Sequence, residues 1–80
     1  MPRDAQLKKA FVKGLGVSSN APIETFEFSK TEHWDSIGHM KLIAAIEEEF
    51  LIQLDVNDIL GMSSYTIAKE IIQKYLDHQK

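Results

Sequence analysis

Apolar residues recur at steps of three and four positions in three segments of this chain, which is the spacing of amphipathic helices. The first segment runs from Asp4 to Leu15, and its apolar side consists of Leu7, Ala10, Phe11, Gly14 and Leu15. Asp4 is placed to cap this helix, and Gly16 suits the left-handed conformation in which many helices end. The pattern therefore predicts a first helix over residues 4–15.

The second segment, from about Ser36 to Leu51, carries two stripes. The natural core face consists of Leu42, Ala45, Ile46 and Phe50. A second stripe on another side of the helix contains Ser36, Met40, Ile43, Ala44 and Glu47. Because apolar groups share this side with a serine and a glutamate, we expect some of them to be exposed.

The last helices are marked by their end residues. Asp55 can cap a short helical turn that reaches Leu60, with Gly61 ending it. Ser63 or Ser64 then caps a final helix that extends to about Asp77. Its apolar face consists of Tyr65, Ala68, Ile72 and Tyr75 or Leu76.

Residues 17–34 show no sustained helical period, but they include the apolar anchors Ile23, Phe26, Phe28 and Trp34. We expect a long connection that packs on the domain, and no segment alternates as a half-buried strand does. The chain is therefore predicted to be all-α: one domain over residues 1–80, a small bundle of three main helices plus one short helix, with a long loop between helices one and two.

Asp35 and Ser36 stand where the second helix begins. Asp35 is a strong N-cap residue, since its carboxylate can accept the unpaired N–H groups of the first turn. Ser36 then takes the first helical position. A phosphate ester there would lie beside free N–H groups and the positive end of the helix dipole, an effect of roughly 0.3–1 kcal/mol for a surface charge.

Composition narrows the class of protein. With 44% hydrophobic and 26% charged residues the chain is typical of globular domains, and no apolar run reaches the length of a membrane span. It has no cysteine and three scattered histidines, so we expect no disulfide and no metal site. The start, Met1-Pro2-Arg3-Asp4, has no secretory pattern. We therefore expect a cytoplasmic monomer that does not bind membranes.

Charge is concentrated in the middle of the chain, where residues 16–62 hold nine acidic and two basic side chains, a charge of −7. This distribution argues against nucleic acid as a partner, because nucleic-acid binding requires clustered Lys and Arg. It favours partners with a basic face, although an ordinary solvated surface explains the same charge.

Two kinds of chemistry do not fit this sequence. Asp35, His33 and His39 crowd around Ser36, but the strand–turn–helix context of a hydrolase serine is missing. A calcium loop starting at Asp55 would need a glycine at its sixth position and a glutamate at its twelfth, where this chain has Leu60 and Thr66. We expect neither an enzyme nor a calcium site.

Several landmarks together resemble the acyl carrier proteins and the related peptidyl carrier domains. They are Leu15-Gly16-Val17 at the end of the first helix, Phe28 in the loop, Asp35-Ser36-Ile37 as the D-S-L modification motif, and Leu42 with Ala45-Ile46-Glu47-Glu48-Glu49-Phe50 in the second helix. The resemblance covers essentially the whole chain, and the spacing between the landmarks also fits.

The resemblance implies that a phosphopantetheinyl transferase moves 4′-phosphopantetheine from coenzyme A onto Ser36, beside the capping Asp35. The thiol of this arm would carry an acyl or aminoacyl thioester between enzymes. Acyl or aminoacyl ligases and acyl-processing enzymes would then dock on a face made of Ile37, Met40, Ala44, Glu47 and Glu48. The same residues are also explained by ordinary packing or by a solvated helix face.

Departures from the common family pattern occur close to the serine. Glu32, His33 and Trp34 stand where many members have a leucine-glycine pair, and Gly38 and Lys41 replace frequent acidic residues. We expect a stand-alone carrier of a specialised pathway, with partner choice determined by Trp34, Gly38 and Lys41. The alternative is an unmodified helical protein–protein interaction module that uses the side of Met40 and Ala44.

Overall fold

The computed structural model describes residues 3–77 of the chain. Its helices are α1 (Arg3–Leu15), α2 (Ser36–Phe50), α3 (Val56–Gly61) and α4 (Tyr65–Asp77), with a 3-10 turn, η1, at Ile23–Thr25. Within these residues no strand forms, and one isolated bridge joins Glu27 to Ser64. The predicted all-α bundle of three main helices and a short one is confirmed. None of its helices combines the length and hydrophobicity needed to cross a membrane.

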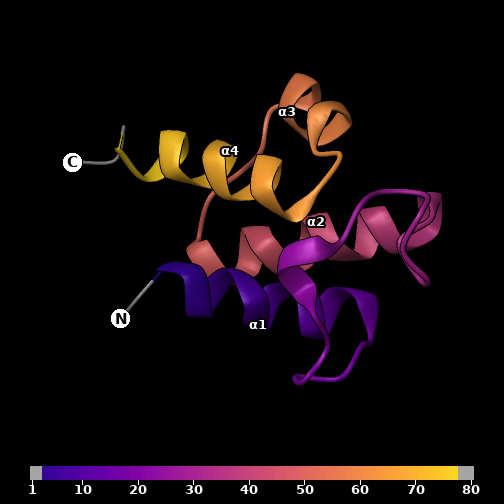
Figure 1. The fold of residues 1–80 in the computed structure, drawn as a ribbon. Helices are drawn as coiled ribbons and strands as arrows, with labels where there is room; N and C mark the ends of the chain where they lie inside the picture. Colours follow the sequence, from indigo (N-terminus) through magenta and orange to yellow (C-terminus); the bar gives the residue numbers. More distant parts are fainter. Residues whose placement is uncertain (1–2, 78–80) are drawn as a thin grey trace.

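The helices α1 and α2 lie side by side and run in opposite directions (Figure 1). Their close approach depends on Gly14, because a Cβ atom built there would lie 2.6 Å from the Cα of Leu42. The core face predicted for α2 is confirmed, since Leu42, Ala45, Ile46 and Phe50 are all buried. On α1 the buried side is formed by Leu7, Ala10, Phe11 and Leu15.

The prediction that Asp4 caps α1 is wrong, because the helix already begins at Arg3 and Asp4 lies inside its first turn. Its carboxylate instead accepts a hydrogen bond of 2.5 Å from the hydroxyl of Tyr65, at the start of α4. Asp4 therefore ties two helices together. At the other end, Gly16 has a φ of +70°, which confirms the left-handed end predicted for this helix.

The connection between α1 and α2 is packed, as predicted. Ile23, Phe26 and Trp34 are buried in the core and Phe28 packs against it. The backbone N–H of Phe28 donates to the carbonyl of Ser63, and that of Tyr65 donates to the carbonyl of Phe26. These bonds fasten the loop to the start of α4, where the hydroxyl of Ser64 caps the helix by accepting from Ile67.

The short helix α3 begins directly after Asp55, as predicted, and runs one residue past its predicted last residue, Leu60. Asp55 occupies the N-cap position, but its side chain makes no capping hydrogen bond, and its backbone N–H donates to the Tyr75 hydroxyl at 2.7 Å. Gly61 is the last helical residue, and Met62 takes the cap position after it. None of the residues of α3 is fully buried, but Ile59 packs against the core.

Candidate functional site

The start of α2 has the local structure that the sequence predicts. Asp35 is extended, with φ −100° and ψ −167°, and its carboxylate accepts a hydrogen bond of 2.8 Å from the N–H of Gly38. The helix then begins at Ser36, whose side chain is exposed. Asp35 is therefore an N-cap, and the hydroxyl of Ser36 lies at the mouth of the helix in contact with solvent.

Gly38 is required by a contact within the chain. A Cβ atom built on Gly38 would overlap the carbonyl oxygen of His33, which has a left-handed backbone with φ +73°. The loop therefore passes directly over the first turn of α2. The expectation that Gly38 determines partner choice is wrong in its physical basis, because this glycine is buried and its missing side chain accommodates the chain's own backbone.

Trp34 is also not available to a partner, because it is fully buried. Its indole N–H donates to Nδ1 of His39 at 2.9 Å. Nε2 of the same imidazole lies 2.7 Å from the carbonyl oxygen of Ile59, in α3. Since an indole nitrogen is only a donor, Nδ1 must accept, and the ring proton lies on Nε2, where it donates to α3. The expectation that Trp34 determines partner choice is thus corrected: it connects the loop to α2.

Four rings form a cluster beneath the start of α2, which we call the aromatic cluster: Phe11, Phe28, Trp34 and His39. The rings of Trp34 and His39 stack with their centroids 6.1 Å apart. Phe28 contacts both rings edge-on, with centroid distances of 6.4 Å to Trp34 and 5.1 Å to His39. Phe11 meets Trp34 edge-on at 5.2 Å. The structural role of His39 was not expected, although this residue lies one turn before Leu42 on the core side of α2, a position that predicts burial.

The exposed side of α2 starts at Ser36. Ile37 is 70% exposed and Met40 58% exposed, and Ala44 is exposed as well. The prediction that Ile43 shares this exposed stripe is wrong: its side chain is 3% exposed and belongs to the core. The three apolar residues predicted for a partner face are therefore exposed on α2, the helix that begins at the serine.

The two acidic residues predicted for that face already have partners in the chain. The carboxylate of Glu47 is half-buried and accepts a hydrogen bond of 2.8 Å from the N–H of Leu54. Glu48 is exposed and pairs with Lys13 of α1 at 2.7 Å, and this lysine lowers the pKa of the Glu48 carboxyl. A basic partner would have to compete with Lys13 for Glu48, whereas Glu47 serves the fold.

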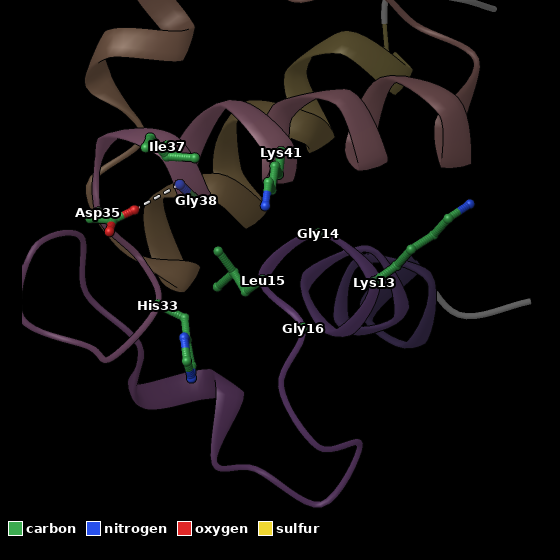
Figure 2. A pocket seen from close by; sticks show the side chains of 9 residues that line it. All are labelled: Lys13, Gly14, Leu15, Gly16, His33, Asp35, Ile37, Gly38 and Lys41. Atoms are coloured by element: carbon green, nitrogen blue, oxygen red, sulfur yellow. Dashed lines mark hydrogen bonds between the residues drawn. The ribbon is translucent and has the colours of Figure 1, made fainter.

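A cleft of about 360 Å³ lies between the end of α1 and the start of α2 (Figure 2). Leu15 points into it, and Lys41 projects from α2 above Gly14. The side chain of Lys13 extends away from the cleft, toward its partner Glu48. Lys41 is exposed and has no ion-pair partner among residues 3–77, so of the three residues at which partner choice was expected, it alone is accessible there.

The chemistry of this site is that of an accessible hydroxyl. Within the described part of the chain, no side chain hydrogen-bonds to the hydroxyl of Ser36, and both ring nitrogens of His39 are bound elsewhere. A general base must lie within hydrogen-bond reach of the proton it removes. In the same region, no group of three His, Asp or Glu side chains is arranged to hold a metal ion.

No family model matches this chain, and neither a curated protein nor a solved structure matches it. The residues of the site therefore provide the evidence on function.

Proposed function

We propose that this chain is an acyl carrier protein that bears a 4′-phosphopantetheine arm, derived from coenzyme A, on Ser36. The observation that carries the proposal is the position of this serine: exposed, at the first residue of α2, directly after the capping Asp35. The arm would carry acyl or aminoacyl groups as thioesters on its terminal thiol. The protein would deliver them between enzymes and would catalyse no reaction itself.

The backbone at the helix mouth suits a phosphodiester. The carboxylate of Asp35 accepts a hydrogen bond from the N–H of Gly38, but the N–H groups of Ser36 and Ile37 have no acceptor within residues 3–77. Such free N–H groups at the positive end of a helix dipole bind phosphate oxygens well. A phosphate ester on Ser36 would thus lie next to unused donors, and its arm would extend directly into solvent.

The exposed side of α2 would be the docking face for a phosphopantetheinyl transferase, for acyl or aminoacyl ligases and for acyl-processing enzymes. Ile37 and Met40 supply exposed apolar contacts in the first turns after Ser36, with Ala44 one turn further along. Methionine is an adaptable contact for several partners. Lys41 interrupts the acidic character of this face, which supports a carrier of a specialised cytoplasmic pathway over one of general fatty acid synthesis.

The test is enzymatic modification of the whole chain. Incubation with coenzyme A, magnesium and a broad-specificity phosphopantetheinyl transferase should add the mass of one phosphopantetheine, seen in the intact mass. Ser36→Ala should abolish the gain. Ser19→Ala, at another exposed serine, is the matched control and should leave it unchanged. Absence of any gain with several transferases would contradict the proposal.

A second candidate is an unmodified interaction module, and the exposed apolar side chains favour it. Leu60 of α3 is 78% exposed, so it is a large apolar side chain in contact with solvent, as Ile37 and Met40 of α2 are. Such residues on neighbouring helices could hold an amphipathic partner helix. This candidate predicts saturable binding by the unmodified chain that Ser36→Ala leaves unchanged and Met40→Asp weakens.

A further inference from the structure

The cleft between the end of α1 and the start of α2 is lined by residues on both sides of Ser36 along the chain (Figure 2). They include Asp35, directly before the serine, and Ile37, directly after it, with Lys41 one turn further along α2. The cleft volume of about 360 Å³ lies within the range of protein binding pockets, about 300–1,000 Å³. Because neighbouring Cα atoms are only about 3.8 Å apart, an enzyme that contacts Ser36 also meets residues that line this cleft.

Lys41 brings an unpaired positive charge to this cleft. Residues 16–62 hold nine acidic side chains and only two basic ones, Lys30 and Lys41. The ammonium group of Lys30 lies 3.4 Å from the carboxylate of Glu27. Lys41 is exposed and has no ion-pair partner within residues 3–77. An isolated cation thus lies in an otherwise acidic part of the chain.

Acidic side chains at the start of α2 and further along it are bound to other groups. Asp35 lines the same cleft, but its carboxylate accepts a hydrogen bond of 2.8 Å from the N–H of Gly38. Glu48 pairs with Lys13 at 2.7 Å, and the side chain of Lys13 extends away from the cleft (Figure 2). The charge of Lys41 is therefore complementary to a carboxylate that another protein presents, and such complementarity gives protein interfaces their specificity.

The backbone that carries Lys41 is held against α1. A Cβ atom built on Gly14 would lie 3.1 Å from the carbonyl oxygen of Lys41, and Leu42, the next residue, is fully buried. Only the side chain of Lys41 must therefore be ordered when it binds a partner, which limits the entropy lost. Beside it, Leu15 points into the cleft and Ile37, 70% exposed, lies in its lining (Figure 2). These two residues offer apolar contacts next to the charge.

We propose that this cleft receives an acidic side chain of the enzyme that docks at Ser36, with its carboxylate paired to Lys41 and its aliphatic part against Leu15 and Ile37. The proposal rests on the carrier function argued above and names the chemistry of the partner, of which the phosphopantetheinyl transferase is the first to test. Lys41 is then a specificity-determining residue. It favours an enzyme with a carboxylate at this position and repels one with a basic side chain there.

The experiment measures the kinetics with which a broad-specificity phosphopantetheinyl transferase modifies the whole chain. Lys41→Glu should raise the KM for the chain by up to about fivefold, the upper range for an exposed ion pair, and leave kcat nearly unchanged. Lys41→Gln should have a smaller effect. Lys9→Glu makes the same change in net charge at another lysine without an ion-pair partner in the described chain, outside the cleft, and should leave KM unchanged. Thermal unfolding verifies that all variants fold.

A charge exchange then identifies the partner group. Each exposed Asp and Glu around the active-site mouth of the transferase is changed to Lys in turn. One of these variants should modify the parent chain slowly and Lys41→Glu faster, because the ion pair forms again with its charges exchanged. An unchanged or lowered KM in Lys41→Glu, or no transferase variant that Lys41→Glu rescues, would overturn the proposal. In that case the parent chain is still modified and the carrier function stands, whereas a parent chain that no transferase modifies contradicts both.

Discussion

The indole N–H of Trp34 donates to Nδ1 of His39 at 2.9 Å, and this bond joins the residue just before the Asp35-Ser36 pair to the second turn of α2. The other ring nitrogen of His39 continues the connection to the carbonyl of Ile59 in α3. One imidazole thus fixes three parts of the fold around the serine. The orientation of the helix mouth and the place of α3 are therefore set by the same buried side chain.

Replacing this imidazole should destabilise the domain. His39→Phe keeps an aromatic ring but leaves the indole N–H of Trp34 and the carbonyl of Ile59 without partners, at about 1–3 kcal/mol for each buried group. Urea unfolding followed by Trp34 fluorescence would measure the loss. Trp34→Phe and the double variant complete a cycle that isolates the bond between the two rings. Additive losses would contradict a direct coupling, and Met40→Phe, at an exposed neighbour, should change stability little.

Two glycines in helices should respond in opposite ways to alanine. Gly38→Ala places a Cβ against the carbonyl oxygen of His33, so the loop or the first turn of α2 must shift. We expect a loss of about 1–3 kcal/mol, the usual cost of forcing extra atoms into a packed site. Gly61→Ala meets no atom within 4 Å and should stabilise by roughly 0.5–1 kcal/mol. Thermal unfolding of both variants checks this pair, and equal effects would contradict it.

The helices were predictable because their apolar positions repeat with the helical period and because each signal is local. Asp35 caps α2 and Gly16 ends α1. Each of these helix ends can be predicted from a single residue type at a single position. Asp4 was misassigned because α1 begins one residue earlier, and the hydroxyl of Tyr65, 61 positions away, binds its carboxylate. Local propensity carries no information on such a distant partner.

The residues around Ser36 show the same limit. Trp34 and Gly38 are unusual choices beside a modification motif, and from sequence alone an unusual choice is explained equally well by a partner or by the fold. Burial decides between the two: Trp34 fills the core and Gly38 admits the carbonyl of His33. Ile37, Met40 and Ala44 could be placed from sequence, because the helical period alone separates them from the core face.

Stability should fall in acid because several carboxylates, Asp4 and Asp58 among them, are held in their ionised form. The Tyr65 hydroxyl, and then Lys69 and Lys8, lower the pKa of Asp4 below its ordinary value. The Tyr75 hydroxyl and Lys74 do the same to the pKa of Asp58. A lowered pKa in the folded chain adds stability above the ordinary value, and this stability is lost as the pH falls through the folded pKa.

We therefore expect a urea midpoint that is flat near neutral pH and falls below about pH 4. Asp58→Asn should lower the midpoint at neutral pH and make the acid decline shallower, because one of the carboxyl groups with a lowered pKa is gone. Asp55→Asn, at a neighbouring aspartate whose side chain caps nothing, is the control. An acid decline of the same slope in Asp58→Asn and the parent chain would show that Asp58 does not contribute.

Substitutions of the adjacent residues Glu47 and Glu48 of α2 should distinguish an effect on stability from an effect on docking. Glu47→Ala removes the acceptor of the Leu54 N–H, and since Leu54 is buried we expect a loss of about 1–3 kcal/mol in urea unfolding. Glu47→Gln keeps a carbonyl oxygen and should recover part of it. Glu48→Ala breaks only an exposed pair with Lys13, so its unfolding curve should match that of the parent.

The ion pair between Glu48 and Lys13 also allows a test of the proposed docking face. Glu48→Lys reverses a charge on the exposed side of α2, and we expect slower modification of Ser36 by the transferase at unchanged stability, because a basic partner meets repulsion there. Lys13→Ala frees Glu48 from its intramolecular partner and should have the opposite effect on the rate. Unchanged rates in both variants would remove Glu48 from the docking face. Any rate change in Glu47→Ala must be judged against its lost stability, because that carboxylate holds the chain after α2.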